Sequence, residues 1–473
     1  MRLDRIYDED LAHASYLIGC QATGEAVVVD ARRDIGEYLD LAERHDLQIV
    51  AVTETHIHAD YLSGTRELAA ATGARIYLSG EGGSDWQYGF EGTRLYDRMS
   101  FTVGNITIQA RHTPGHTPEH LSFLVTDGAF SSEPGYLLSG DFIFVGDLGR
   151  PDLLDEAAGG VDTRFAGAQD LFTSLQDLLT DLPDHVQIYP AHGAGSACGK
   201  ALGAVPATTV GYERLYAWWA PYLRAGDKEG FVDELLAGQP DAHAYFARMK
   251  RQNRVGPPVV GPVAPLTEWD NGDLAAAIHA NKVIFADTRP WEEVHEATVP
   301  GALHIPGPDK AATYGAWVYD PEKETTPLVL LAPDSAVAED IRAHLMRVGI
   351  DEVAGYTTEV AGLPRTVPAT VAAGDLKNLT DHDGAQLLDV RNRTEHAEGA
   401  IPGSDQLAVS RLMWHLDELP SAGAIVIYCQ SGNRSSVAGA ALRRAGYDVV
   451  ELTGGIQAWW QAGETVSTPA LAR

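Results

Sequence analysis

The chain has 473 residues, 45% of them hydrophobic, which is enough for about two to four domains that each bury a core. Its 66 acidic and 35 basic residues give a formal net charge of −31, which disfavours nucleic acid and anionic membranes as partners. The first residues are polar, no apolar run reaches the ~20 residues that span a bilayer, and only three cysteines are present. We therefore expect a reduced protein of the cytoplasm.

Short β-branched runs alternate with helical stretches over residues 1–255 and predict a layered α/β domain. Histidines and aspartates follow several predicted strands directly, at the edge where such domains bind ligands. Residues 255–262, Val-Gly-Pro-Pro-Val-Val-Gly-Pro, cannot continue a helix and predict a linker. A weaker boundary at Pro364 and Pro368 divides the rest into domains at 256–368 and 369–473.

These last two domains are predicted to be copies of one α/β unit, because their sequences match at a nearly constant offset. Residues 287–289 (Asp-Thr-Arg) match 389–391 (Asp-Val-Arg) at an offset of 102. The apolar run 328–332 matches 425–429 at an offset of 97. Only the second copy has a cysteine at the end of this run. The first copy continues with Asp334, which would repel an anion, so we expect it to be inactive.

Four strand-end segments carry side chains that bind metals. Each places an imidazole or a carboxylate just after an apolar run, and this mixture of ligands suits zinc, iron or manganese. The segments are Thr55-His56-Ile57-His58-Ala59-Asp60-Tyr61, Thr113-Pro114-Gly115-His116-Thr117, Ser139-Gly140-Asp141 and Tyr189-Pro190-Ala191-His192. Four such segments in this order indicate a metal centre.

The four segments resemble the metallo-β-lactamase superfamily, in which H-x-H-x-D-H is followed by a separate His, Asp and His. The resemblance covers roughly residues 1–250 and implies an αββα sandwich. Tyr61 stands where the superfamily has the last histidine of its first motif. A neutral phenol is a poor ligand for a divalent cation, so the second metal site of the dizinc hydrolases is expected to be damaged. One metal is therefore favoured.

Among mononuclear members the pattern is most similar to the persulfide dioxygenases, which share the run Gly149-Arg150-Pro151-Asp152. This resemblance implies that His56, His116 and Asp141 hold one Fe(II) per chain as a facial triad, with open positions for a persulfide and O₂. The remaining polar residues of the motifs would then orient ligands or substrate, or be relics of a lost second site. These residues are His58, Asp60 and His192.

Two further residues near the predicted metal have alternative roles. Arg150 could pair with a substrate carboxylate, because a guanidinium binds one in fork geometry, or it could form a structural ion pair. Cys198 follows His192 closely and could carry a sulfur, or it could be a small buried residue.

Cys429 begins a loop between a predicted strand and a predicted helix. Backbone N–H groups in such a loop and the N-terminus of the helix favour an anion, so we expect a nucleophilic cysteine of lowered pKa. Arg434 would add a fixed positive charge, and both residues are predicted to be catalytic. The other residues predicted to bind the persulfide are Gln430, Ser431, Gly432, Asn433 and Ser435.

Together with residues 389–391, 399–403 and 452–456 and Trp459, this loop strongly resembles a rhodanese domain over about residues 372–470. A cysteine loop with an arginine could also hold phosphate, as in phosphatases. The loop has the rhodanese length, however, and the acidic chain disfavours phosphate substrates.

The order of the three domains resembles the bacterial persulfide dioxygenase–rhodanese fusion proteins of sulfide detoxification. That resemblance implies oxidation of a persulfide of glutathione, coenzyme A or another thiol by O₂ to sulfite, and formation or use of thiosulfate at Cys429. We also expect a homo-oligomer, and the acidic charge leads us to expect no nucleic acid or membrane partner. The alternatives are a dizinc thioester hydrolase of the glyoxalase II type fused to a rhodanese, and a non-enzymatic sulfur carrier or redox sensor.

Overall fold

The chain forms two compact units in this computed structural model, which describes residues 1–156, 159–160, 162–381, 384–419 and 423–469. The first unit contains Met1–Gln239 and Phe246–Val263, and the second contains Pro240–Tyr245 and Ala264–Arg473. The first unit thus extends past the predicted boundary at residue 255. Six residues before that boundary belong to the second unit instead.

Hydrogen bonds from side chains of the first unit explain why the predicted linker, residues 255–262, belongs to that unit. The Glu67 carboxylate accepts hydrogen bonds from the backbone N–H groups of Val260 (2.8 Å) and Gly261 (2.7 Å). Arg66 donates to the carbonyls of Gly256 and Pro257 at 3.0 and 2.6 Å. The polar backbone of a segment without regular structure is therefore satisfied by this unit.

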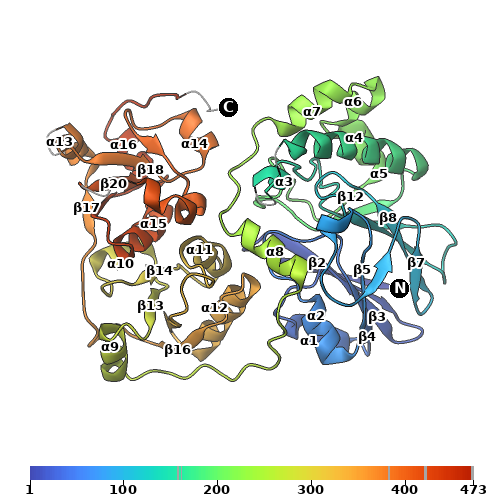
Figure 1. Ribbon diagram of the computed structural model, residues 1–473, viewed down its shortest axis with the longest axis horizontal. Coiled ribbons are helices and arrows are strands. Elements are labelled where there is room, and N and C mark those ends of the chain that lie inside the picture. Colours follow the sequence, from blue (N-terminus) through green and yellow to red (C-terminus); the bar gives the residue numbers. More distant parts are fainter. Residues whose placement is uncertain (157–158, 161, 382–383, 420–422, 470–473) are drawn as a thin grey trace. The chain divides into compact units, whose positions relative to one another are not determined.

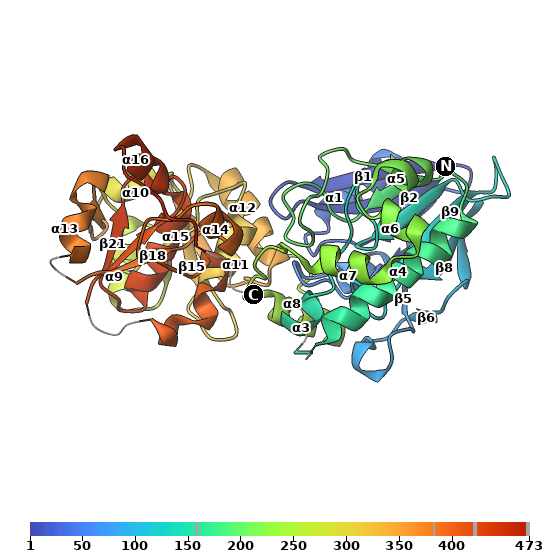
Figure 2. The same ribbon diagram turned by 90° about the horizontal axis from the view of Figure 1, so that it is seen from above.

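The first unit consists of two six-stranded sheets packed face to face, with helices on both outer sides (Figures 1 and 2). This is the predicted αββα sandwich. In sheet order, the first sheet contains β1 (Arg2–Asp8), β2 (His13–Cys20), β3 (Glu25–Val29), β4 (Gln48–Thr53), β5 (Arg75–Ser79) and β6 (Thr93–Leu95). The second contains β12 (Thr208–Thr209), β11 (Gln187–Pro190), β10 (Tyr136–Gly140), β9 (Leu121–Asp127), β8 (Ile106–His112) and β7 (Ser100–Val103).

Helices α1 and α2 lie on one outer side of the sandwich, and α4 to α7 lie on the other (Figure 1). The helices of this unit are α1 (Gly36–Arg44), α2 (Thr65–Thr72), α3 (Leu153–Glu156), α4 (Thr163–Asp181), α5 (Val210–Tyr216), α6 (Ala220–Ala225), α7 (Lys228–Leu236) and α8 (Phe246–Val255), with a 3₁₀ turn at Ser84–Trp86. Figure 2 shows the long helix α4 from above.

Burial on both faces explains the continuous apolar runs of the strands. In β3, Val27 and Val29 join the core between the sheets, whereas Ala26 and Val28 join the core under α1 and α2. Successive side chains of a strand point to opposite faces, so a strand covered on both sides must be apolar throughout. Cys20 belongs to the core between the sheets.

The second unit contains two separate parallel sheets, and the predicted boundary at residue 368 falls between them. In sheet order, the strands of the first are β14 (Leu303–His304), β13 (Ile284–Asp287), β15 (Leu328–Leu331) and β16 (Val353–Thr357). Those of the second are β17 (Ala369–Val371), β21 (Val449–Leu452), β20 (Ile425–Tyr428), β18 (Gln386–Asp389) and β19 (Asp405–Gln406).

The helices of the second unit are α9 (Asn271–His279), α10 (Trp291–Glu296), α11 (Ala311–Val318), α12 (Ser335–Arg347), α13 (Leu376–Asp381), α14 (Arg393–Glu398), α15 (Asn433–Arg444) and α16 (Gly455–Gln461). Short 3₁₀ turns lie at Ala373–Asp375, Val409–Trp414 and Leu416–Glu418. None of the helices in the described parts of the chain is both long and apolar enough to cross a membrane.

The predicted repeat is visible in the order of the strands. Reading from β14 gives β14-β13-β15-β16, and reading from β19 gives β19-β18-β20-β21, so the two copies match strand by strand and the second copy adds β17. Matching ion pairs accompany this order. Arg289 binds Asp287 at 2.7 Å in the first copy, and Arg391 binds Asp389 at 2.6 Å in the second. We refer to residues 264–368 as the middle copy and to residues 369–469 as the C-terminal copy.

The segment Pro240–Tyr245 attaches to the C-terminal copy through Asp241. One oxygen of its carboxylate accepts a hydrogen bond from the backbone N–H of Arg393 at 2.8 Å, at the first residue of α14. The other lies 2.9 Å from the Arg393 side chain. A carboxylate at this position satisfies an N–H group that the helix leaves without a partner.

Candidate metal centre and cysteine loop

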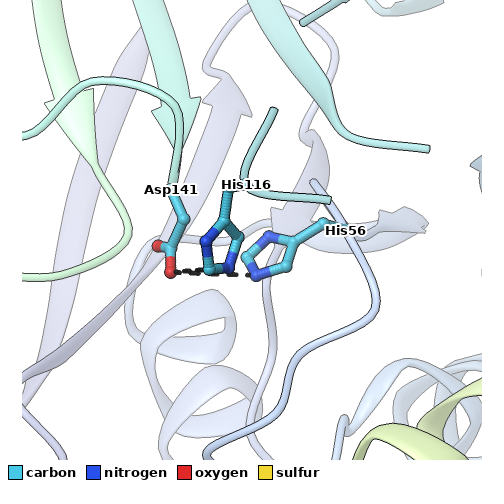
Figure 3. Close-up of side chains that lie close together, drawn as sticks. All are labelled: His56, His116 and Asp141. Atoms are coloured by element: carbon cyan, nitrogen blue, oxygen red, sulfur yellow. Dashed lines mark ion pairs between the residues drawn. The ribbon is translucent and has the colours of Figure 1, made fainter. Parts of the chain in front are cut away.

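Three side chains from different strand ends meet in the first unit. His56 follows β4, His116 follows β8 and Asp141 follows β10. Asp141 Oδ2 lies 3.5 Å from His116 Nε2 and 3.8 Å from His56 Nε2, and all three atoms lie within 4.8 Å of one another. Figure 3 shows the three side chains pointing toward one another. These are the three residues that the resemblance to the persulfide dioxygenases implied as ligands.

Hydrogen bonds fix the orientation of both imidazoles. His116 Nδ1 donates to the carbonyl of Arg150 at 3.0 Å, which leaves a lone pair on Nε2. His56 Nδ1 lies 2.9 Å from the hydroxyl of Thr55. Burial lowers the pKa of both histidines, and neighbouring histidines lower that of His56 further. Neutral imidazoles with inward-facing Nε2 atoms are what a metal ion requires.

The carboxylate of Asp141 completes a donor set that fits a cation. Its Oδ1 lies 2.6 Å from His192 Nδ1, whereas its buried Oδ2 has no hydrogen-bond partner among the described residues. Burial alone would raise the pKa of this carboxyl group, but the charge and hydrogen bond of His192 hold it well below its usual range. A buried anionic oxygen beside two lone pairs is costly without a cation between them.

His192 connects Asp141 with a second group of polar residues. Its Nε2 lies 2.8 Å from Asp60 Oδ2, so each ring nitrogen faces a carboxylate. Asp60, His192 and Cys198 also place one possible ligand atom each within 4.8 Å of one another. Cys198 is buried, and this burial raises the pKa of its thiol to about 12. A protonated thiol is a weak nucleophile, which agrees with the packing alternative for Cys198.

Asp30 is a residue of this centre that the sequence analysis did not single out. It follows β3 and accepts hydrogen bonds from the backbone N–H of Thr55 (2.7 Å), and it lies 3.0 Å from His58 Nε2. The Tyr61 hydroxyl donates to the Asp30 carbonyl at 3.1 Å. His58 and Tyr61 are therefore held by Asp30. The signal was present, because Asp30 directly follows an apolar strand like the other residues of the centre.

Arg150 has structural partners for its whole guanidinium group. It forms a double hydrogen bond with the carboxylate of Asp152, and its Nη1 donates to the carbonyl of Ala197 at 3.1 Å. Of the two predicted roles, the structure shows the ion pair. The chain also passes very close to the metal centre here, since a Cβ at Gly149 would lie 1.8 Å from the carbonyl oxygen of Asp141. Gly149 therefore allows the Arg150 carbonyl to reach His116.

A cavity of about 450 Å³ lies beside this centre and was not predicted. It is lined by Ile57, Asp85, Trp86, Ala247, Lys250, Arg251 and Arg254. Burial lowers the pKa of Lys250 to about 8, and the Glu119 carboxylate opposes this shift. Glu119 also accepts a hydrogen bond from the backbone N–H of Ile57 at 2.7 Å, next to His56. Lys250, Arg251 and Arg254 place three cationic side chains on this one cavity, although the net charge of the chain is −31.

The cysteine loop lies in the C-terminal copy between β20 and α15, as predicted. The backbone N–H of Gly432 donates to Cys429 Sγ at 3.2 Å, and the Ser435 hydroxyl donates to it at 3.5 Å. Cys429 is only 1% exposed. Of the other predicted loop residues, Gln430 lies 3.5 Å from Arg391 and Ser431 is exposed. Donors that converge on sulfur would stabilise a thiolate or a persulfide anion.

The positive charge of Arg434 is paired with a carboxylate of the same copy. Its two terminal nitrogens donate to the two carboxylate oxygens of Glu395 at 2.6 and 2.7 Å. Burial acts to raise the pKa of Glu395, but the hydrogen bonds and charge of Arg434 outweigh it and lower the pKa. Glu395 thus shares the charge of Arg434 and holds the loop to α14.

We expect the substitution Glu395→Gln to weaken sulfur transfer by Cys429. The change removes one charge-assisted pair worth about 1.4 kcal/mol, which corresponds to a roughly tenfold lower kcat/KM. The measurement is transfer of sulfur from thiosulfate to cyanide. Glu398→Gln is the matched control, because Glu398 is an exposed residue of the same helix. Equal rates for both variants would contradict a positioning role of Glu395.

The middle copy has a different arrangement at the matching place. The Asp334 side chain accepts a hydrogen bond from the backbone N–H of Val337 at 2.9 Å and caps α12. The carboxylate thus occupies the helix N-terminus that would otherwise face an anion. This geometry agrees with the expectation that the middle copy has no sulfur-transfer activity of its own.

Comparisons with known proteins agree with this division of the chain. The family described as "Metallo-beta-lactamase superfamily" matches residues 8–192, and the "Rhodanese-like domain" matches residues 372–462. The crystal structure of a metallo-beta-lactamase from Staphylococcus aureus subsp. aureus COL is 37% identical, with a TM-score of 0.67. It covers 76% of this chain and 99% of that one. The first unit alone makes up less than 76% of the chain, so the structural similarity extends into the second unit.

Two curated proteins resemble the two halves separately. A protein named "Sulfurtransferase" from Allochromatium vinosum is 38% identical over 94 residues, which are 20% of this chain and 88% of that protein. "Probable polyketide biosynthesis zinc-dependent hydrolase BaeB" from Bacillus velezensis is 24% identical over 230 residues, which are 48% of this chain and 89% of that protein. The chain belongs to the metallo-beta-lactamase superfamily, a family of metal-binding proteins, and it carries a rhodanese sulfurtransferase domain after the metal-binding fold.

Proposed function

We propose that the chain oxidises a low-molecular-weight persulfide at a single iron ion in its first unit and transfers sulfur at Cys429 in its second. The first reaction converts a persulfide, O₂ and water into the parent thiol, sulfite and two protons. The second moves one sulfur atom between Cys429 and a sulfur oxyanion. Both reactions belong to the oxidative removal of sulfide.

One observation supports the iron site above all others, namely the group formed by His56, His116 and Asp141. Two imidazoles and one carboxylate are the ligand set typical of non-haem Fe(II) oxygenases, which keep positions open for substrate and O₂. Tyr61 takes the place of a nitrogen ligand for a second ion, and its hydroxyl is bonded to the Asp30 carbonyl. Both ring nitrogens of His192 face carboxylates. These contacts favour one ion.

Residues of the chain would prepare this site in three ways. The Arg150 carbonyl and Thr55 orient the two imidazoles, and His192 orients Asp141. The surrounding burial excludes water. Iron bound here would offer open positions to a persulfide and O₂ and would pass electrons from the persulfide sulfur to O₂. The cavity with Lys250, Arg251 and Arg254 would bind the anionic groups of a thiol carrier such as glutathione or coenzyme A.

At the second site the atoms balance without an external oxidant. The Cys429 thiolate attacks the outer sulfur of thiosulfate, the S–S bond of thiosulfate breaks, and sulfite leaves with the bonding electron pair. The product is Cys429–S–S⁻, whose charge the Gly432 N–H and the Ser435 hydroxyl would stabilise. The reverse reaction consumes sulfite and forms thiosulfate.

Metal analysis combined with oxygen uptake tests the proposal. We expect about one iron per chain and O₂ consumption on addition of glutathione persulfide, because one facial triad binds one ion. The control is the same protein after iron is removed with a chelator and then restored. Two zinc ions per chain in a sample that hydrolyses a glutathione thioester and consumes no O₂ would contradict the proposal.

A hydrolase is the second candidate function, and the group formed by Asp60, His192 and Cys198 favours it. Together with His56, His116 and Asp141, this group could hold a second ion, and the relative from Bacillus velezensis is named a zinc-dependent hydrolase. Hydrolysis of a glutathione thioester by the zinc-loaded chain, without O₂, distinguishes this function from the first.

A further inference from the structure

The middle copy contacts α15, the helix that follows the cysteine loop, at its first and last turns. At the first turn of α15, Asn433 Nδ2 donates to the Tyr314 hydroxyl at 3.2 Å. At its last turn, Arg444 lies 2.7 Å from Glu324. Between these points, His295 lies 2.9 Å from Glu451 of β21, and Glu451 also binds Arg443 at 2.8 Å. Each of these contacts joins a residue of one copy to the other, apart from the pair formed by Glu451 and Arg443.

Trp291, the first residue of α10, lies against the cysteine loop. A Cβ at Gly432 would lie 2.9–3.1 Å from three atoms of the Trp291 ring. The indole therefore packs directly on the backbone of the residue whose N–H donates to Cys429 Sγ. Gly432 is buried, although a loop between a strand and a helix is normally open to solvent. The φ of Gly432 is +125°, a conformation that L side chains rarely adopt.

Tyr314 of α11 forms a second aromatic contact beside the loop. Its ring packs against Trp317 in a T-shaped arrangement with 5.1 Å between ring centroids. Trp317 Nε1 in turn donates to His243 Nδ1 at 3.5 Å. The Tyr314 ring is therefore held by its packing against Trp317, while its hydroxyl accepts the hydrogen bond from Asn433. Two aromatic rings of the middle copy thus border residues 432 and 433, whereas Ser431 is exposed.

We propose that the middle copy forms one wall of the Cys429 site, and that Trp291 and Tyr314 determine which sulfur compounds reach the thiolate. The wall narrows access to a cysteine that is only 1% exposed. It admits small sulfur oxyanions such as thiosulfate and sulfite, and it excludes bulky persulfides of tripeptides or nucleotides. The choice of sulfur oxyanions rests on the proposed function, whereas the restriction of size rests on the contacts alone.

Alkylation of Cys429 by reagents of two sizes tests the restriction of size. Full-length protein reacts with iodoacetamide or with fluorescein maleimide, and mass spectrometry of the peptide that contains Cys429 gives each rate. We expect Trp291→Ala to raise the rate with the large reagent roughly tenfold relative to the small one, which corresponds to about 1.4 kcal/mol. Trp460→Ala is the matched control, because Trp460 is 44% exposed on α16 of the same unit.

A larger increase in the alkylation rate for the large reagent than for the small one indicates loss of a steric barrier. An equal increase for both indicates a more mobile loop. If Trp291→Ala raises the alkylation rates of both reagents by the same factor, the loop has become mobile and the proposal is wrong. If it changes neither rate, the proposal is also wrong. This readout needs no sulfur-transfer activity, so a chain that fails to use thiosulfate would refute the proposed function and still report on the wall.

The milder variant Tyr314→Phe tests the role of the hydroxyl without changing the size of the ring. We expect a several-fold higher KM for thiosulfate with an unchanged kcat, since loss of the hydrogen bond to Asn433 would misplace the loop for binding by about 1 kcal/mol. Tyr216→Phe, on an exposed tyrosine of the first unit, is the control. An unchanged KM would exclude Tyr314 from the site.

Discussion

The variant Cys429→Ser is expected to lose sulfur transfer from thiosulfate while it retains oxygen uptake with a persulfide. A serine hydroxyl is not ionised near neutral pH and forms no persulfide, so the sulfur atom has no acceptor. Loss of a nucleophile that acts as one unit with its surroundings lowers a rate on the order of a thousandfold or more. The Gly432 N–H and the Ser435 hydroxyl remain in place but have no sulfur anion to stabilise.

Both activities are measured on the same preparation, with cyanide as the sulfur acceptor and an oxygen electrode for the other reaction. Cys20→Ser is the matched control. Its sulfur lies in the core between the two sheets and accepts a hydrogen bond from the backbone N–H of Asn105 at 3.3 Å, so a hydroxyl can replace it. Undiminished sulfur transfer by Cys429→Ser would show that another residue accepts the sulfur.

The variant His116→Ala is expected to lose its metal and all oxygen uptake while sulfur transfer from thiosulfate continues. One of three protein ligands disappears, and the substitution leaves a cavity beside the buried Oδ2 of Asp141. Disruption of groups that merely support ligands weakens metal binding 10–100-fold in other proteins, so removal of a ligand should exceed about 100-fold. Iron content after dialysis against a chelator gives the result directly.

His185→Ala is the control for this experiment, because His185 is an exposed histidine of the same unit. It should keep the iron content and the oxygen uptake of the unaltered chain. If His116→Ala retains one firmly bound iron, the ligand set must be different, and Asp60 with His192 would be the next residues to replace.

Local patterns in the sequence predicted a layered α/β domain, the repeat, and metal-binding side chains at strand ends, since strand ends that share a sheet edge lie together. The αββα sandwich and the ligand set of His56, His116 and Asp141 came from the resemblance to a known family. Asp30 was missed although it has the same local signal, because its partners become apparent only when β3 lies beside β4. Its role is to hold His58 and Tyr61, which no short motif describes.

Contacts between residues far apart in the chain could not be predicted from the sequence. Arg434 and Glu395 are 39 positions apart, and nothing in either segment indicates that their side chains form a double hydrogen bond. The same holds for Trp291, which belongs to the middle copy and packs on Gly432 of the C-terminal copy. The contacts of the middle copy with α15 show that it packs against the C-terminal copy.

The attachment of Asp241 to α14 has a consequence for how the two halves of the chain can be separated. A fragment that starts after the proline-rich stretch would look complete by composition, yet it would lack the carboxylate that caps the helix carrying Glu395. A fragment that starts at Pro240 would keep this carboxylate but would take α8 away from the sandwich. The two halves are interleaved along the chain, so genetic fission at any single point removes a part that one of them uses.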